Sequence, residues 1–237
     1  IKRATFAITS LVALAGIFIA FKFNRTDAGL QFVEKHSWIS NFGINYAVGV
    51  DGIALVLIVM SVILAPIVVL AGWNEALGGR WSVKTLYILL LVLETMMIGV
   101  FSATDIFLFY VFFEAMLIPV YFLIGGYGTG QRAQAAVKFL LYSLLGGLLM
   151  LASIIGLYVI AGSQVGHTFD IGALSTLQIS SSTQNWLFLG FFIAFAIKAP
   201  LWPLHTWLPT AARSSSAGVA TLLLGVLDKV GTYGMIR

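Results

Sequence analysis

Long apolar runs, each close to 20 residues, alternate with short polar segments along this chain. About 20 apolar residues in a helix span the ~30 Å hydrocarbon layer of a bilayer. The runs lack the period-two alternation that marks transmembrane strands. The pattern predicts an all-α integral membrane protein, a polytopic helical bundle of about seven spans. The predicted spans are residues 4–21, 50–71, 85–102, 104–126, 136–161, 185–201 and 216–236.

Composition agrees with a membrane environment. The chain is 60% hydrophobic and 9% charged, whereas soluble domains carry roughly 25% charged residues. We therefore expect residues 1–237 to form a single transmembrane domain. The net charge of +4 is spread over short connections, and such a distribution does not favour nucleic-acid binding. Cysteine is absent, which excludes disulfides, thiolate zinc sites and cysteine-ligated iron–sulfur clusters within the chain.

The distribution of basic residues predicts the orientation. Cytoplasmic loops of membrane proteins carry an excess of Lys and Arg. Seven spans divide the basic residues seven to four between the two sides, so we expect the first side to be cytoplasmic. Residues 162–184, which contain no Lys or Arg, then form an outer loop, and residues 127–135 lie in the cytoplasm. The two sets are Lys2, Arg3, Arg80, Lys84, Arg132, Lys138 and Arg213 against Lys22, Arg25, Lys35 and Arg237.

Three charged residues interrupt the apolar runs: Glu114, Lys198 and Lys229. Glu114 lies ten residues into its span, about 15 Å from the outer face at 1.5 Å per residue, and the two lysines are at comparable depth. Charge near the bilayer centre is costly and usually marks an ion or proton path. The alternative is a buried ion pair that only joins helices. Three such charges on three helices favour transport.

Prolines predict two interruptions of the helices. Pro119 removes the hydrogen bond to the carbonyl of Ala115 and should kink the helix beside Glu114. Pro200 and Pro203 follow Lys198 within a stretch that is too apolar for a solvated loop. We expect a helix that breaks inside the membrane, which is tolerated where the freed backbone is buried or lines a wet cavity.

The residue types suggest a proton relay. A lysine held between burial and a nearby carboxylate can load or release a proton when its partner moves. Lys198 and Glu114 fit this description, with Lys229 as the next group and Lys138 as an entry group. Asp228 lies about 100° from Lys229 round the helix and can face a different neighbour. A fixed Glu114–Lys198 salt bridge would give the same sequence pattern.

Other patterns have simpler meanings. Ser143 with Gly147, and Ala152 with Gly156, are pairs of small residues that let neighbouring helices approach closely. The histidines have no metal-ligand spacing, and no Ser/His/Asp arrangement is present. We expect neither a metal site nor a bound cofactor in this chain.

Five motifs together resemble the subunit M family of bacterial respiratory complex I, the NADH-quinone oxidoreductase. The same family includes the mitochondrial subunit 4, and sister antiporter-like subunits share parts of the pattern more loosely. The motifs are Val50-Asp-Gly-Ile53, Phe107-Leu-Phe-Tyr-Val-Phe-Phe-Glu-Ala-Met-Leu-Ile-Pro119, Ala136-Val-Lys-Phe-Leu-Leu-Tyr-Ser143, Lys198-Ala-Pro-Leu-Trp-Pro-Leu-His-Thr-Trp-Leu-Pro209 and Asp228-Lys-Val-Gly-Thr-Tyr-Gly234.

The resemblance implies a fold and a set of roles. Family members have fourteen helices with two inverted five-helix repeats, so the present spans correspond to helices two to eight and the chain to a fragment with the first repeat. Glu114 matches the family's essential glutamate, Lys198 the lysine at the helix break, and Lys229 the lysine of the next helix. His205 matches a histidine after the break. Thr210 stands where the family usually has an aspartate.

The expected function is proton translocation in the bacterial inner membrane, within a complex whose other subunits hold flavin, iron–sulfur clusters and quinone. One alternative is a subunit of a multisubunit sodium/proton antiporter, which shares the Glu and Lys residues but needs no quinone. Another is a structural membrane scaffold without transport.

Overall fold

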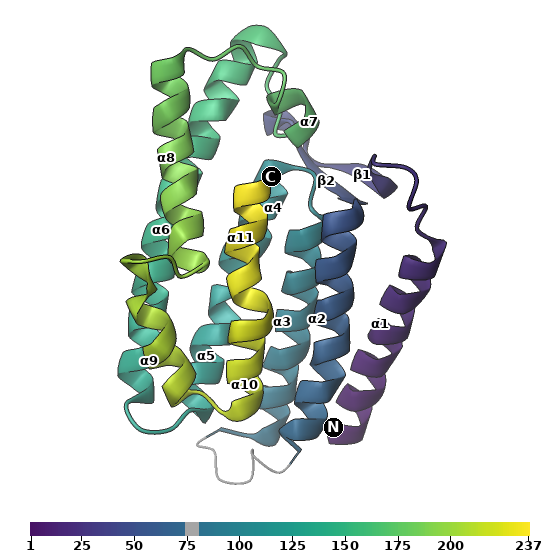
Figure 1. Ribbon diagram of the computed structural model, residues 1–237, viewed down its shortest axis with the longest axis vertical. Helices are drawn as coiled ribbons and strands as arrows, with labels where there is room; N and C mark the ends of the chain where they lie inside the picture. Colours follow the sequence, from purple (N-terminus) through teal and green to yellow (C-terminus); the bar gives the residue numbers. More distant parts are fainter. Residues whose placement is uncertain (74–80) are drawn as a thin grey trace.

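The computed structural model describes residues 1–73 and 81–237. Within these residues six segments are helical, long and apolar enough to cross a membrane. They lie side by side in one bundle (Figure 1). The prediction of a polytopic helical bundle is confirmed. The six segments are α1 (Lys2–Lys22), α2 (Gly52–Ala71), α3 (Val83–Ser102), α4 with α5 (Ile106–Tyr127), α6 (Arg132–Gln164), and α10 to α11 (Ala217–Ile236).

The run predicted at 185–201 lies almost entirely in one helix, which ends at Lys198, and a second, shorter helix follows it. Helix α8 (Ser181–Lys198) begins with a run of polar residues. Its mean hydropathy is therefore too low for it to count among the six segments that could cross a membrane. After Lys198 the chain leaves the helix, makes the short turn η3 (Leu204–Thr206) and enters α9 (Trp207–Ser214). Figure 1 shows α9 continuing below α8, so that the two together run the height of the bundle. The predicted break after Lys198 is present in the structure.

A second predicted interruption also occurs. Helix α4 (Ile106–Ala115) ends and α5 (Leu117–Tyr127) begins on either side of Met116. Pro119 lacks the N–H that would bond to the Ala115 carbonyl, which accounts for the break at this point. The last span has an interruption that the sequence did not indicate. Its α10 (Ala217–Leu222) passes through a π-helical turn, η4 (Leu223–Leu227), into α11 (Asp228–Ile236).

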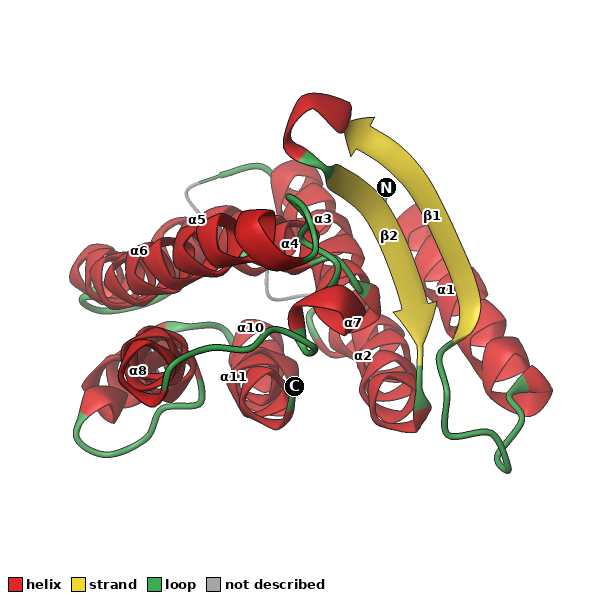
Figure 2. Ribbon diagram, turned by 90° about the horizontal axis from the view of Figure 1, so that it is seen from above, coloured by secondary structure: helices red, strands yellow, loops and turns green. Residues whose placement is uncertain are grey.

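A β-hairpin was not predicted. Strand β1 (Gln31–Ile39) pairs antiparallel with β2 (Ile44–Val50) through the 3-10 turn η1 (Ser40–Phe42). Gly43, at φ 69°, closes the turn in the left-handed region that favours glycine. Seen from above, the hairpin lies across the ends of α1, α2 and α3 (Figure 2). The short helix α7 (Ile171–Leu174) lies beside it.

The two groups of connections expected on opposite sides do lie at opposite ends. The N-terminus and the segment before α6 share one end with the turn after α9, where Thr129 N–H donates to the Ser214 carbonyl at 2.7 Å. The hairpin, α7 and Arg237 lie at the other end, and Arg237 Nη1 lies 2.7 Å from Asp51. Arg80, one of the charges counted above, falls outside the described residues. The assignment of one end to the cytoplasm stays a prediction.

Candidate functional site

Glu114 lies in the last turn of α4, directly before the interruption at Met116. At the other end of α4, Asp105 accepts hydrogen bonds from the N–H groups of Phe107 and Leu108 and so fixes where the helix starts. The Glu114 carboxyl lies against Gly147 of α6, where a Cβ atom would be only 1.7 Å from Oε1. Oε1 is buried and has no hydrogen-bond partner. A carboxyl group therefore occupies a recess inside the helical bundle.

Lys198 is the last residue of α8 and is 1% exposed. Its Nζ lies 4.7 Å from the ring centre of Phe113 and 5.8 Å from that of Phe139, within cation–π range. Nζ has no hydrogen-bond partner. The break after Lys198 frees backbone carbonyls, and the buried Trp207 Nε1 donates to the Ile197 carbonyl at 2.8 Å. The charged group thus sits at a helix end that the surrounding side chains stabilise.

Glu114 and Lys198 lie near each other, because the ring of Phe113, the residue before Glu114, is 4.7 Å from Lys198 Nζ. No oxygen of Glu114 lies within 4.0 Å of Lys198 Nζ, so the two do not form a direct salt bridge. Two opposite charges that are near but not bonded can exchange a proton through an intervening group or a small movement. A permanent ion pair, the alternative raised by the sequence, is not what this conformation contains.

Lys229 is placed differently. Its Nζ lies 2.6 Å from Asp228 Oδ2, and its side chain is 44% exposed. Helix α11 meets α8 at Gly231, where a Cβ would be 2.4 Å from the Ala199 nitrogen. Lys229 is two residues before Gly231, about 200° round the helix, so it faces away from Lys198. Asp228 and Lys229 pair with each other rather than facing different neighbours.

Lys138 contacts the segment that follows the break. Its Nζ donates to the Thr206 carbonyl at 2.7 Å and to Thr210 Oγ1 at 3.5 Å. Tyr142, one turn further along α6, shares a hydrogen bond with Thr206 Oγ1 at 2.9 Å. The turn also contains His205, whose buried Nδ1 has no hydrogen-bond partner. Thr210, at the position where the resemblance leads us to expect an aspartate, therefore offers Lys138 a neutral oxygen atom.

The sequence reasoning missed Glu94 in the middle of α3. This residue is 3% exposed, and its Oε1 has no hydrogen-bond partner. The signal was available, because Glu94 interrupts the apolar run 85–102 as Glu114 interrupts the next. Buried carboxyl groups in spans are functional candidates by the same rule.

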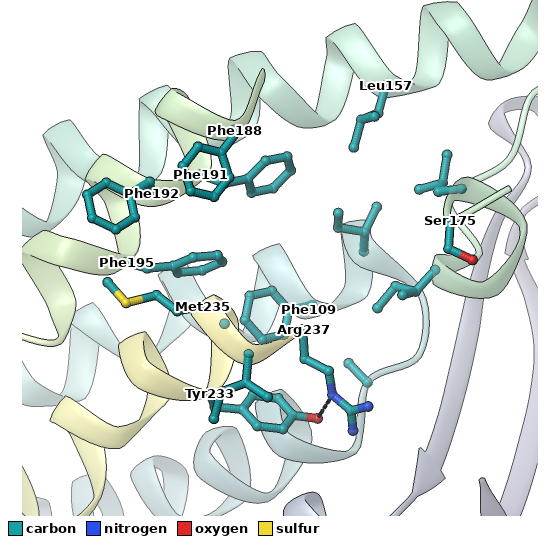
Figure 3. A pocket seen from close by; sticks show the side chains of 16 residues that line it. Phe109, Leu157, Ser175, Phe188, Phe191, Phe192, Phe195, Tyr233, Met235 and Arg237 are labelled. Atoms are coloured by element: carbon teal, nitrogen blue, oxygen red, sulfur yellow. Dashed lines mark hydrogen bonds between the residues drawn. The ribbon is translucent and has the colours of Figure 1, made fainter. Parts of the chain in front are cut away.

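A separate cavity of about 530 Å³ opens between α4, α6, α8 and α11. Phe188, Phe191, Phe192 and Phe195 of α8 line one wall (Figure 3). Arg237 lies on the other side, and its Nε donates to the Tyr233 hydroxyl at 2.9 Å. Neither Glu114 nor Lys198 lines this cavity. The cavity is lined mainly by apolar side chains, and it does not connect Glu114 with Lys198.

Outside the spans, two carboxylates hold together the connections at the end of the bundle that carries the hairpin. Asp105 also accepts from the Asn45 N–H at 3.0 Å, which ties β2 to the start of α4, and burial raises the pKa of its carboxyl. Burial alone would raise the pKa of Asp170 too, but the Lys35 ammonium at 2.9 Å and the Ala173 N–H outweigh it, so the pKa is lowered. These contacts fasten the hairpin over the ends of the helices.

The chain matches the model of a known family, described as "NADH:quinone oxidoreductase/Mrp antiporter, TM", over residues 103–237. It is 45% identical over 269 aligned positions to NADH-quinone oxidoreductase subunit M of Mycobacterium tuberculosis, with 100% of this chain and 49% of that protein covered. The chain therefore spans about half the length of this relative.

Two solved membrane complexes contain chains with the same fold as this one. Respiratory complex I from Thermus thermophilus contains a chain that superposes with a TM-score of 0.87 at 31% identity, covering 100% of this chain and 48% of that one. The Mrp complex from Dietzia sp. contains a chain that superposes with a TM-score of 0.86 at 20% identity, covering 100% of this chain and 25% of that one. The second likeness concerns the fold alone.

Proposed function

Because the chain belongs to the NADH:quinone oxidoreductase/Mrp antiporter family of membrane proteins, we propose that it translocates protons as subunit M of NADH:quinone oxidoreductase. Glu114 and Lys198 exchange the proton, and Lys138 with His205 provides access from the cytoplasmic end. Lys229, which faces away from Lys198 in this conformation, passes the proton on after its side chain leaves Asp228. The subunit lies in the bacterial inner membrane. Redox energy reaches it from partner subunits that hold flavin, iron–sulfur clusters and quinone.

The observation that carries the proposal is the arrangement of Glu114 and Lys198. The Lys198 side chain and the Glu114 Oε1 atom are buried beside helix interruptions. The two residues are neighbours, since the ring of Phe113 lies at Lys198 Nζ, but they form no direct salt bridge. A structural ion pair would bring the charges into contact, because burying two charges is compensated only by good mutual geometry. Charges held apart favour transfer of a proton over fixed attachment.

The second candidate is a subunit of a sodium/proton antiporter. Its support is the superposition on the Mrp complex, which is nearly as good as that on complex I. The higher identities to NADH-quinone oxidoreductase chains, 45% and 31% against 20%, favour the first candidate.

The test uses the intact complex that contains this subunit, purified and reconstituted in vesicles. We expect co-purification of flavin and iron–sulfur subunits, and NADH-driven proton uptake that Glu114→Gln or Lys198→Ala reduces about a hundredfold. Lys35→Ala, which changes a half-exposed lysine at the outer end, is the matched control and should pump normally. Assembled Glu114→Gln and Lys198→Ala complexes that both pump at the wild-type ratio of protons to NADH would refute the proposal.

A further inference from the structure

Ser143 of α6 is a buried hydroxyl that the relay described above does not use. The residue is 2% exposed, and its Oγ has no hydrogen-bond partner. Lys198 Nζ and Glu114 Oε1 are likewise buried without a partner. Buried polar atoms without partners are uncommon in folded proteins. Three of them on three adjoining elements, α4, α6 and α8, point to a shared role.

The position of Ser143 follows from how α6 and α8 cross. The two helices run in opposite directions, and Gly146 of α6 lies against Ala194 of α8, with a Cβ position 3.2 Å from the Ala194 Cα. Lys198 is four residues beyond Ala194, about 6 Å along the helix. Moving the same distance back along α6 from Gly146 leads to residues 142–143. Ser143 and Lys198 are therefore at the same depth.

Glu114 adjoins the same face of α6. Its carboxyl fills the recess at Gly147, one turn from Ser143, and residues four apart lie on one face of a helix. The ring of Phe113, the neighbour of Glu114, and the ring of Phe139, one turn before Ser143, both lie at the Lys198 ammonium. Ser143 thus lies at the level of the base, Lys198, and one turn of α6 from the recess that holds the acid, Glu114.

The chemistry of the three groups is complementary. An ammonium group only donates hydrogen bonds, an ionised carboxylate only accepts them, and a hydroxyl does both. A hydroxyl is therefore suited to accept from Lys198 and donate to Glu114 at the same time. The phenylalanine rings that surround Lys198 cannot take that place.

We infer that Ser143 bridges Glu114 and Lys198 when their side chains move into hydrogen-bond distance during proton transfer, with Gly147 providing the recess that holds the carboxyl one turn away. This inference rests on the proposed function. In the transfer, one N–H bond of the Lys198 ammonium breaks and its proton binds the Ser143 oxygen, while the original hydroxyl proton passes to Glu114. Lysine becomes a neutral amine, glutamate a neutral acid, and serine is unchanged. The reverse step restores both charges.

The test compares four variants of the intact NADH-oxidising complex in vesicles. Ser143→Ala removes the hydroxyl at nearly constant volume, and Ser143→Thr keeps it. Ser153→Ala removes another buried hydroxyl of α6, 5% exposed and ten residues away, and is the matched control. Glu114→Gln reports on the proposed function itself. Assembly, protons pumped per NADH and the pH profile of pumping are measured for each.

We expect Ser143→Ala to assemble and to pump about tenfold less, with a changed pH profile, while Ser143→Thr and Ser153→Ala pump normally. If Glu114→Gln stops pumping and Ser143→Ala does not, the inference is wrong and the proposed function stands. If Ser143→Ala fails to assemble and Ser143→Thr assembles, the hydroxyl stabilises the fold, and the inference is wrong as well. If Glu114→Gln pumps normally, Glu114 does not accept the proton and the inference is wrong, whereas the proposed function fails only if Lys198→Ala pumps normally too.

Discussion

The substitution Gly147→Ala tests the recess at Glu114 directly. The added Cβ would lie 1.7 Å from Oε1, 2.4 Å from Cδ and 2.9 Å from Oε2 of Glu114. To reach ordinary contact at 3.4 Å, the carboxyl must retreat by about 1.7 Å. Overpacking a well-packed interior costs about 1–3 kcal/mol of stability. A displacement of about 1 Å at reacting groups costs on the order of a hundredfold in rate.

We therefore expect the Gly147→Ala complex to assemble with somewhat lower thermal stability and to pump at least tenfold more slowly. Gly125→Ala is the control, because its Cβ would meet Ala136 at an ordinary 3.4 Å. Assembly is followed by native gel and thermal inactivation, and pumping by acidification of vesicles on addition of NADH.

A double-mutant cycle separates the clash from other effects. In a Glu114→Ala background the carboxyl is gone, so Gly147→Ala should then cost little stability, giving a coupling energy of about 1–3 kcal/mol. Pumping stays low in that background, because the acid is absent. If Gly147→Ala matches Gly125→Ala in both stability and pumping, or if the cycle shows no coupling, the recess does not position Glu114 and the reasoning is refuted.

Two further predictions concern the outer end and the orientation. The lowered pKa of Asp170 means that its contact with Lys35 contributes stability above pH 3.8, the ordinary pKa value, and that this contribution is lost as pH falls through the lower native pKa. Protease cleavage of the hairpin should rise over that acidic range in wild type, whereas an Asp170→Asn variant should already be more readily cleaved at neutral pH; identical pH curves for the two would contradict the role. For orientation, Ser181→Cys should react with an impermeant thiol reagent from outside and Gln131→Cys only after the membrane is opened, in a chain that has no other cysteine. Outside labelling of Gln131→Cys would reverse the topology.

The sequence alone determined the features that depend on local composition. Runs of apolar residues specify spans, because each backbone polar group in lipid must be satisfied within its own helix. Pro119 and Pro200 specify interruptions, since proline lacks the donor that continues a helix. Glu114 and Lys198 could be identified because charge in an apolar run is costly wherever the helix packs. Glu94 was open to the same reasoning.

Only the tertiary structure decided which of these residues meet. The hairpin depends on pairing between β1 and β2 and on its place across the ends of the helices, neither of which a local pattern encodes. The spacing of Ser143 and Gly147 predicts only a close helix contact, whereas the packing of α4 against α6 shows that Gly147 accommodates a carboxyl group. Lys229 illustrates the converse, because the π-helical turn before α11 and the contact at Gly231 set the direction in which its side chain points. Residue type fixes what a side chain can do, and packing between helices distant in sequence fixes which partner it finds.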